Sequence, residues 1–383
     1  MLDRTNKINS LAILIPNIDV EPFAGIAKAL VKGFSSAGIK DLYIVDLRAN
    51  QTNRSDNLPV GAHVIGLNTN RASRSVRACK KFIEQYKPDI LITMPTTINV
   101  PSIVGWLGTK KVSGNTKLVI SEHAIMSYEA FVEYKHIPKL RILPFLARFF
   151  YPYASGMVAN SFSVQKDIYT LGIKMKGRST VIPNPIDLNY VRLLSKETVD
   201  HNWLVDKKKP VILGVGRLAK IKNWPLLLEA FSLLKTEVDS RLVIIGEGSE
   251  KEHLERQIKK LNLERDVDLP GYQLNPWKWM ARSDVLALTS NVESCGLVIM
   301  ESMACGIPVV AVDSYGGGPR FIMDGGRYGC LVGANASNIK TAIKELLVNQ
   351  EKRQKIIEEQ NTRVETFNFD NISKRWLSYL QSL

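Results

Sequence analysis

Glu293 and Glu301 are the two residues of this chain whose surroundings most strongly suggest a ligand site. Glu293 lies just before an expected helix start at residues 295–296, and Glu301 lies about two turns into that helix, in an otherwise apolar stretch. Burying a carboxylate costs several kcal/mol unless it is paired, so we expect ligand hydroxyls to satisfy Glu301. The free N–H groups and the dipole of the helix N-terminus favour an anion nearby. The alternative is that Glu293 serves the helix dipole and Glu301 is solvated on the helix face.

A second candidate segment, residues 211–224, predicts a buried strand, a glycine turn and a helix. Gly214, Gly216 and Ala219 nearly match a dinucleotide fingerprint, in which backbone N–H groups bind the pyrophosphate. Here the turn also carries Arg217 and Lys222, and such cations suit a leaving diphosphate, whose growing charge they would stabilise. The alternative is an ordinary strand-to-helix turn with solvated basic residues.

Three consecutive glycines, residues 316–318, follow an apolar run at residues 308–312. Glycine has no Cβ, so this loop permits close approach of the backbone to a ligand. It equally permits a tight turn, and the sequence leaves the two interpretations open.

These candidate residues need a scaffold, and short apolar runs alternate with amphipathic stretches along nearly the whole chain. This alternation is typical of βα units and parallel sheets. We expect helices at residues 224–235 and 250–261. We expect strands at residues 11–15, 43–45, 90–93, 118–120, 157–159, 211–213, 242–245, 285–288 and 308–312.

The 383 residues exceed one ordinary domain and suffice for two. The segment Ile182-Pro183-Asn184-Pro185 forces an extended backbone, and a polar run of lysines precedes a new buried strand. We therefore expect an N-terminal domain over residues 1–190, a C-terminal domain over residues 191–365, and a helix over residues 366–383 that could pack back on the N-terminal domain. Two doubly wound α/β domains of this kind would face each other across a cleft, with ligands at the carboxyl ends of the strands.

Positive charge is concentrated in the first half of the chain. The formal net charge is +14, and residues 1–190 hold 24 Lys and Arg against 13 Asp and Glu. A basic half indicates an anionic partner, although the excess could also serve solubility alone. No nucleic-acid-binding module accompanies the charge, so a lipid surface or a phosphorylated substrate is favoured. Four cysteines without a CxxC pair indicate neither a disulfide framework nor a zinc site, and a cytoplasmic protein is expected.

Two basic segments are candidates for contact with an acceptor or a membrane. The first recurs at every third position along an expected helix: Arg71, Arg74, Arg77 and Lys80. The second, residues 139–151, mixes large apolar and aromatic residues with three cations: Lys139, Arg141 and Arg148. This second segment suits an interfacial helix on an anionic membrane, and a core helix of the N-terminal domain is the open alternative.

Together these segments resemble the family 4 glycosyltransferases, which have the GT-B fold of two Rossmann-like domains. The family's Glu-x7-Glu element matches Glu293 and Glu301, and its Gly-Arg-Leu…Lys element matches residues 216–218 and Lys222. The similarity covers residues 180–335 and extends more loosely over the N-terminal half. It also includes three further segments: Ile182-Pro183-Asn184 with Asp187, Gly246-Glu247-Gly248, and residues 303–310.

The resemblance implies a role for each matching residue. Arg217 and Lys222 would hold the donor diphosphate as catalytic groups, helped by the backbone N–H groups of Gly296 and Leu297. Glu301 would bind the ribose hydroxyls, and Glu293 would contact the donor sugar near its reacting face. His123, which follows a buried strand, matches a histidine beside the donor sugar, and a structural histidine is the alternative. The remaining implied donor contacts are Gly216, Gly246, Tyr272, Leu274 and Cys295.

Two departures from the family pattern concern this site. The family's Gly-Gly pair after the first strand is absent, and only Gly25 lies near the corresponding residues 19–25. This absence suggests an unusual acceptor. Glu293-Ser294-Cys295-Gly296 replaces a more usual Glu-Gly-aromatic order, which should alter the floor of the donor pocket.

The resemblance implies a retaining transferase that moves a hexosyl group from a nucleoside diphosphate sugar to an acceptor hydroxyl. A UDP-sugar is favoured by the Gly-Pro-Arg run after Asp313, and the acceptor is expected to be a lipid-linked or polysaccharide precursor. No metal or other cofactor is expected, because the sequence offers no DxD-like element in a suitable place. The expected location is cytoplasmic, with the enzyme peripheral on the membrane. The alternatives are a GT-B-type sugar-nucleotide epimerase or phosphorylase, and a non-catalytic scaffold subunit.

Overall fold

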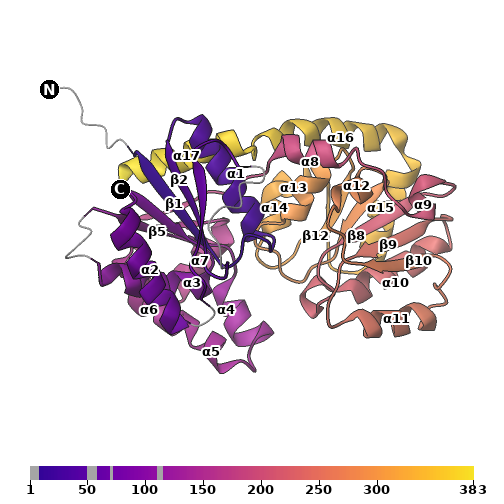
Figure 1. The fold of residues 1–383 in the computed structure, drawn as a ribbon. Coiled ribbons are helices and arrows are strands. Elements are labelled where there is room, and N and C mark those ends of the chain that lie inside the picture. Colours follow the sequence, from indigo (N-terminus) through magenta and orange to yellow (C-terminus); the bar gives the residue numbers. More distant parts are fainter. Residues whose placement is uncertain (1–7, 50–57, 70–71, 110–114) are drawn as a thin grey trace. The chain divides into compact units, whose positions relative to one another are not determined.

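Two compact units make up the chain in the computed structural model, which describes residues 8–49, 58–69, 72–109 and 115–383 (Figure 1). The N-terminal unit runs to Ile186 and includes Phe367–Leu383, and the C-terminal unit is Asp187–Thr366. The last helix, α17 (Phe369–Ser382), therefore belongs to the N-terminal unit. There the hydroxyl of Tyr379 donates to the O of Arg178 at 2.8 Å and accepts from the N of Met157 at 2.9 Å.

A parallel sheet forms the centre of the N-terminal unit, and its seven described strands follow the order β3-β2-β1-β4-β5-β6-β7. The direction of winding reverses between β1 and β4, which is where such sheets bind ligands beyond the carboxyl ends of their strands. The strands are β1 (Ser10–Ile15), β2 (Asp41–Asp46), β3 (Ala62–Gly66), β4 (Ile90–Thr93), β5 (Lys117–Glu122), β6 (Gly156–Ala159) and β7 (Ser179–Val181). The helices before α17 are α1 (Phe23–Ser36), α2 (Ala72–Tyr86), α3 (Thr96–Leu107), α4 (Met126–Tyr128), η1 (Glu129–Glu133), α5 (Pro138–Arg141), α6 (Leu143–Phe150), η2 (Tyr151–Tyr153) and α7 (Phe162–Thr170).

The C-terminal unit repeats this plan with six strands in the order β10-β9-β8-β11-β12-β13, and the winding reverses between β8 and β11. Its strands are β8 (Val211–Val215), β9 (Arg241–Ile245), β10 (Val267–Gly271), β11 (Val285–Leu288), β12 (Val309–Val312) and β13 (Cys330–Val332). Its helices are α8 (Leu188–Leu194), α9 (Asn202–Val205), η3 (Lys220–Lys222), α10 (Trp224–Lys235), α11 (Lys251–Lys260), α12 (Trp277–Met280), α13 (Leu297–Ala304), α14 (Gly318–Ile322), η4 (Asp324–Gly326), α15 (Ala336–Val348) and α16 (Gln350–Glu365).

The expectation of two doubly wound α/β units is confirmed, and every expected strand is present. The sequence pattern missed β3, β7, β10 and β13, which are the edge strands of the two sheets. Most residues of these strands are only partly buried. The continuous apolar run that identifies a buried parallel strand is therefore missing at the edges.

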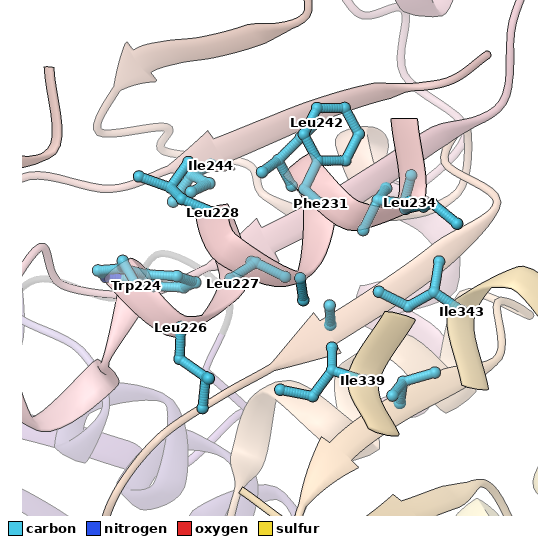
Figure 2. Packing of buried hydrophobic residues seen from close by; sticks show 14 of the residues in the cluster. Trp224, Leu226, Leu227, Leu228, Phe231, Leu234, Leu242, Ile244, Ile339 and Ile343 are labelled. Atoms are coloured by element: carbon cyan, nitrogen blue, oxygen red, sulfur yellow. The ribbon is translucent and has the colours of Figure 1, made fainter. Parts of the chain in front are cut away.

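Helix α10 carries much of the core of the C-terminal unit (Figure 2). Trp224, Leu227 and Phe231 are buried at helical spacing. They pack in one cluster with residues of β9 and α15: Leu242, Ile244, Ile339 and Ile343. The indole Nε1 of Trp224 donates to the backbone O of Arg217 at 2.9 Å, so this core fixes the backbone of the candidate glycine turn.

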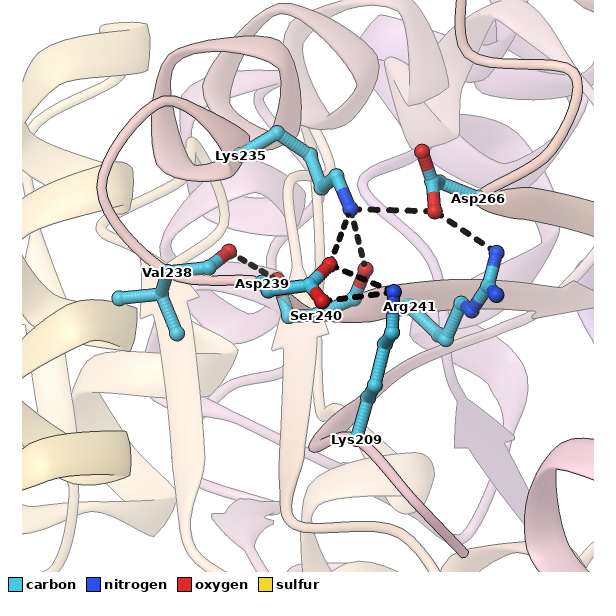
Figure 3. Close-up of polar contacts among 7 residues, drawn as sticks. All are labelled: Lys209, Lys235, Val238, Asp239, Ser240, Arg241 and Asp266. Atoms are coloured by element: carbon cyan, nitrogen blue, oxygen red, sulfur yellow. Dashed lines mark hydrogen bonds and ion pairs between the residues drawn. The ribbon is translucent and has the colours of Figure 1, made fainter.

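A network of ion pairs lies at the amino ends of β8, β9 and β10 (Figure 3). The Nζ of Lys235 lies 2.7 Å from Asp239 and 3.0 Å from Asp266, and Arg241 contacts Asp266 at 2.7 Å. Lys209, from the basic run before β8, pairs with Asp239 at 2.6 Å. Hydrogen bonds from Lys209 and Lys235 lower the pKa of Asp239 to about 2. Lys209 is therefore neutralised within the unit, at the end of the sheet opposite to the candidate turns.

Candidate active site

Backbone packs directly on backbone at the carboxyl ends of β8, β9 and β10. The N of Gly216 donates to the O of Ile245 at 3.0 Å, and the N of Gly246 donates to the O of Gly271 at 2.9 Å. A Cβ on Gly246, whose φ is +144°, would lie 2.0 Å from the O of Gly216. Only glycine fits at this position, and the turn after β8 rests on the turn after β9 with no side chain between them.

Lys222 and Glu293 form an ion pair at this edge of the sheet. Lys222 belongs to η3 after β8, and Glu293 lies in the loop between β11 and α13. The Nζ and Oε2 atoms are 2.7 Å apart, and the two side chains are only 18% and 16% exposed. The Oγ of Ser290 lies 3.4 Å from the same carboxylate oxygen. The structure thus pairs with each other two residues that the sequence assigned separately to the diphosphate and to the sugar.

The glycine run at residues 316–318 supports the Glu293 loop. The N of Glu293 donates to the O of Tyr315 at 2.9 Å, and the N of Gly318 donates to the O of Glu293 at 2.8 Å. A Cβ on Gly318 would lie 2.6 Å from that same O of Glu293. The close backbone approach that the glycines permit is therefore an approach to the Glu293 loop, and it fixes where the carboxylate lies.

Arg217 places a second cation on the turn after β8. Its backbone O is held by Trp224, whereas its side chain is exposed. Across the described ranges of the chain, no carboxylate forms an ion pair with its guanidinium. An exposed and unneutralised guanidinium is well suited to bidentate hydrogen bonds with a phosphate.

Helix α13 begins close to the expected position and carries Glu301. Gly296, with φ +73°, precedes the helix and has no side chain that could cap it. A helix N-terminus of this kind favours an anion through its first N–H groups. Glu301 is partly exposed between the buried Met300 and Ser302. The cost of burying this carboxylate is consequently smaller than the apolar sequence around it suggested.

The other expected donor contacts differ in their exposure. Tyr272 and Leu274, on the loop after β10, are 65% and 87% exposed, so both side chains are available to a planar base. Cys295, in contrast, is buried, and its side chain does not reach the surface. The expectation that Cys295 contacts the donor remains a prediction for the floor of a pocket.

In the N-terminal unit, His123 lies directly after β5. Its Nε2 is 2.9 Å from the Oγ of Ser121, and its ring meets Phe23 edge-on with centroids 5.3 Å apart. Phe23 begins α1, in the segment that lacks a Gly-Gly pair, so an aromatic side chain lies against the histidine there. Burial lowers the pKa of His123 to about 4, although a hydrogen bond with Asn184 acts in the opposite direction. The imidazole is therefore neutral at pH 7.

Sequence reasoning missed the role of the neighbouring carboxylate, Glu122. This side chain is fully buried and accepts hydrogen bonds from Thr96, Asn99 and Tyr151. The one available signal was an acidic residue two positions after the apolar run at residues 118–120. Its partners are distant in sequence, so the pattern alone could not identify them.

The basic residues expected to contact an acceptor or a membrane have different surroundings. Four of them are exposed on α2 and α5: Arg74, Arg77, Lys139 and Arg141. Arg148, on α6, is exposed but lies against the end of α7, since a Cβ on Gly172 would be 3.3 Å from its Cζ. Arg71 lies outside the described residues.

Residues 129–153 present a surface rich in exposed apolar side chains. Helix α6 buries Pro144 and Ala147, whereas Phe145 and Phe149 are 64% and 63% exposed. The core-helix interpretation therefore holds for one side of α6 only. We call the exposed set the aromatic face, and it comprises Phe131, Val132, Ile137, Ile142, Phe145, Phe149 and Tyr153. The rings of Phe131 and Phe145 lie 6.4 Å apart, and those of Phe149 and Tyr153 lie 6.1 Å apart.

Three further features bear on the chemistry that this chain can perform. None of the helices in the described part combines the length and the apolar character needed to cross a bilayer. The same residues contain no group of three or more His, Cys, Asp or Glu side chains placed to hold a metal ion. Burial raises the pKa of both Cys79 and Cys305 to about 12, so neither thiol is a nucleophile at neutral pH.

Both halves of the chain match models of known families. The family described as Glycosyl transferases group 1 matches residues 195–363, and Glycosyltransferase Family 4 matches residues 28–190. A relative from Campylobacter jejuni is 33% identical over 285 residues, which is 74% of this chain and 74% of the relative. Its name is N-acetylgalactosamine-N,N'-diacetylbacillosaminyl-diphospho-undecaprenol 4-alpha-N-acetylgalactosaminyltransferase.

A second relative and a solved structure agree with these matches. The GalNAc-alpha-(1->4)-GalNAc-alpha-(1->3)-diNAcBac-PP-undecaprenol alpha-1,4-N-acetyl-D-galactosaminyltransferase of Campylobacter jejuni is 27% identical over 306 residues, 79% of this chain and 77% of that protein. Anabaena HepE, solved in complex with UDP and glucose, superposes with a TM-score of 0.75 and 21% identity, covering 98% of this chain and 100% of the other. At 21% identity, this similarity shows that the two proteins share a fold.

The depressed pKa of His123 predicts a specific response to acid. A histidine whose pKa falls on folding contributes stability that is present above its unfolded pKa and is lost as the pH falls through its folded pKa. For His123 this window runs from about 6.5 down to about 4. An NMR titration should therefore show a neutral His123 imidazole at pH 5.5, whereas in the urea-unfolded chain the same residue should be mostly protonated.

The His123 resonance is identified by its absence from the spectrum of His123→Gln. As a second readout, the unfolding free energy of wild type should fall relative to that of His123→Gln by about 2 kcal/mol between pH 7 and pH 4.5. A folded protein in which His123 titrates near pH 6.5 would contradict this account of its burial.

Proposed function

Because the chain belongs to the family 4 glycosyltransferases, we propose that it moves a hexosyl group from a nucleoside diphosphate sugar to an acceptor hydroxyl with retention at the anomeric carbon. The donor is a UDP-sugar, which the complex of Anabaena HepE with UDP and glucose supports. The acceptor is a lipid-linked or polysaccharide precursor. The names of the two Campylobacter relatives, which describe undecaprenol-linked saccharides, support this class of acceptor.

The observation that carries the proposal is the Lys222–Glu293 pair on the same edge as the unneutralised Arg217. A bound diphosphate competes with Glu293 for the ammonium group of Lys222, because opposite charges attract more strongly where water is partly excluded. Release of the pair frees the Glu293 carboxylate to accept a hydrogen bond from a sugar hydroxyl. Arg217 and Lys222 then stabilise the negative charge that grows on the leaving diphosphate.

The rest of the donor site follows from the elements around this pair. The N–H groups of Gly296 and Leu297 at the start of α13 bind the diphosphate, and Glu301 binds the ribose hydroxyls. The exposed side chains of Tyr272 and Leu274 contact the base. Gly216 and Gly246 have no side chains, so the ligand can approach the backbone of their turns. The family resemblance adds His123 of the N-terminal unit, neutral at pH 7, as a contact of the donor sugar.

The reaction proposed here uses no metal ion. Arg217 and Lys222 supply two positive charges at the turn, which is the contribution that a metal ion makes to a leaving diphosphate in other transferases. Transfer should therefore proceed at the same rate in the presence of EDTA.

Replacing Lys222 with Ala should lower kcat at least about 100-fold, because removal of one preorganised contact to developing charge costs that much. The measurement is transfer of labelled sugar from the nucleoside diphosphate donor to a lipid-linked acceptor, with and without EDTA. Lys220→Ala is the matched control, because Lys220 is an exposed lysine in the same helical turn. The control should keep a rate near that of wild type.

Four outcomes of this assay would contradict the proposal. An unchanged rate in Lys222→Ala would place the diphosphate elsewhere and favour a scaffold subunit without catalysis. A rate lost in EDTA and restored by Mg²⁺ or Mn²⁺ would show that a metal ion is required. Conversion of the nucleotide sugar without any acceptor would identify an epimerase, and dependence on inorganic phosphate would identify a phosphorylase.

We also propose that the N-terminal unit works at the surface of an anionic membrane, where a lipid-linked acceptor would be found. An exposed apolar patch with a basic rim is typical of proteins that bind lipid. The aromatic face provides the apolar part, and Lys135, Lys139 and Arg141 are exposed cations within the same stretch of chain. Each cation near an anionic surface adds about 1 kcal/mol of attraction.

The double substitution Phe145→Ser with Phe149→Ser should abolish flotation of the protein with vesicles that contain anionic lipid. Wild type should float with such vesicles and should float less with neutral ones, because the cations lose their partners. Phe162→Ser is the matched control, since Phe162 is a similarly exposed phenylalanine on α7, outside the aromatic face. Failure of wild type to float with either kind of vesicle would overturn this part of the proposal.

A further inference from the structure

Glu122 is a carboxylate buried without a cation at the carboxyl end of β5. Its side chain has no exposed surface, and none of the described Lys, Arg or His side chains bonds to it. Three neutral donors hold it instead: the Oγ1 of Thr96 at 2.7 Å, the Nδ2 of Asn99 and the hydroxyl of Tyr151. Burying a charge in this way costs several kcal/mol before its hydrogen bonds are counted. A residue retained at that cost is a candidate for a function beyond packing.

The partners of Glu122 are themselves fixed inside the N-terminal unit. The Oδ1 of Asn99 accepts a hydrogen bond from Thr93 at 2.8 Å, and its Nδ2 also donates to the backbone O of Ser121 at 3.2 Å. Thr93 ends β4, and Asn99 lies in the first turns of α3. Burial raises the pKa of Glu122 to about 6 and that of Tyr151 well above 10, so at pH 7.5 a charged carboxylate faces a protonated phenol.

The geometry of a strand connects this cluster to His123. Successive side chains of a strand point to opposite faces, so Ser121 and His123 share one face while Glu122 occupies the other. The first two bond to each other at 2.9 Å. The backbone is also held, because the N of Asn160 donates to the O of Glu122 at 3.0 Å and its Nδ2 donates to the O of His123 at 3.2 Å. The Glu122 side chain and Asn160 therefore hold the end of β5, and His123 is the next residue of that backbone.

Tyr151 also joins the cluster to the segment of chain that carries the aromatic face. Tyr151 directly follows α6, the helix that carries Phe145 and Phe149. Arg178 holds the same segment in place by donating to the O of Pro152 at 2.8 Å and to the O of Ala154 at 2.9 Å. The bond from Tyr151 to Glu122 thus joins the surface formed by residues 129–153 to the end of β5.

We propose that Glu122 is a positioning residue. The hydrogen bond between Glu122 and Tyr151 keeps His123 at a fixed distance from the aromatic face. This inference rests on the proposed function, in which His123 contacts the donor sugar and the aromatic face contacts the membrane. Once the face lies on the bilayer, the bond determines how far the imidazole is from the lipid surface. The distance matters for an acceptor hydroxyl that is tethered to lipid, and it matters little for an acceptor in solution.

Tyr151→Phe removes the phenolic hydroxyl and keeps the ring, and Glu122→Gln removes the charge and keeps the shape of the side chain. Both should move the His123 resonance in the NMR spectrum and lower kcat for a vesicle-borne acceptor by about 10-fold to 100-fold, because small misplacements of a positioned group have effects of this size. The KM for the donor and the rate with a short, water-soluble acceptor should change less than about threefold.

Tyr379→Phe is the matched control. It also removes a phenolic hydroxyl with two hydrogen bonds, to Arg178 and Met157, but neither bond involves Glu122 or one of its three donors. It should lower the melting temperature and leave both the His123 resonance and kcat per folded molecule unchanged. If Tyr151→Phe, like Tyr379→Phe, changes neither the His123 resonance nor kcat per folded molecule, the proposal is wrong and the cluster has a purely structural role.

The NMR readout separates this inference from the proposed function. If wild type transfers no sugar, the proposed function fails, and an unmoved His123 resonance in both variants would independently overturn the link from Glu122 to His123. If Tyr151→Phe does not fold, Glu122→Gln carries the same test, because a glutamine can occupy the site with its own donor and acceptor. If the variants lower kcat equally for the vesicle-borne and the soluble acceptor, the distance between His123 and the aromatic face does not affect transfer, and the proposal is wrong.

Discussion

The ion pair between Lys222 and Glu293 is the interaction on which the rest of the candidate site depends. A largely buried pair costs desolvation energy that its attraction only partly returns, and well-packed apolar residues are often as stable in its place. Several elements nevertheless hold it. Trp224 fixes the turn after β8 from the core, and the glycine run fixes the Glu293 loop through its backbone. A pair maintained at such cost is readily explained if an anionic ligand replaces one partner.

The two ends of the sheet in the C-terminal unit use charge in opposite ways. At the amino ends of the strands, Lys209, Lys235 and Arg241 are matched by Asp239 and Asp266, and this network contributes to the structure. At the carboxyl ends, no carboxylate of the described residues forms an ion pair with Arg217, and Lys222 pairs with one carboxylate, that of Glu293. The same residue types therefore stabilise the fold at one end and are available to a diphosphate at the other.

Sequence patterns predicted the inner strands, α10 and the glycine turn between β8 and α10, because apolar runs and glycine turns are local signals. They missed the edge strands, whose half-exposed residues break the apolar run. They also missed the bond between Lys222 and Glu293, which are 71 residues apart, and the cluster around Glu122. The glycine run allowed two interpretations, and only the structure shows its approach to the Glu293 loop. Pairings of this kind depend on topology, which no local pattern contains.

The central claim, that the edge with Lys222 and Glu293 binds a nucleoside diphosphate, is tested most directly by nucleotide binding. Thermal unfolding of the full chain would be followed with a panel of nucleoside diphosphates and their sugars, beside Glu293→Gln and Lys222→Ala. UDP or a UDP-sugar should raise the melting temperature of wild type by mass action, and Lys222→Ala should lose most of this shift. No shift with any nucleotide, or an equal shift in wild type and Lys222→Ala, would contradict the claim.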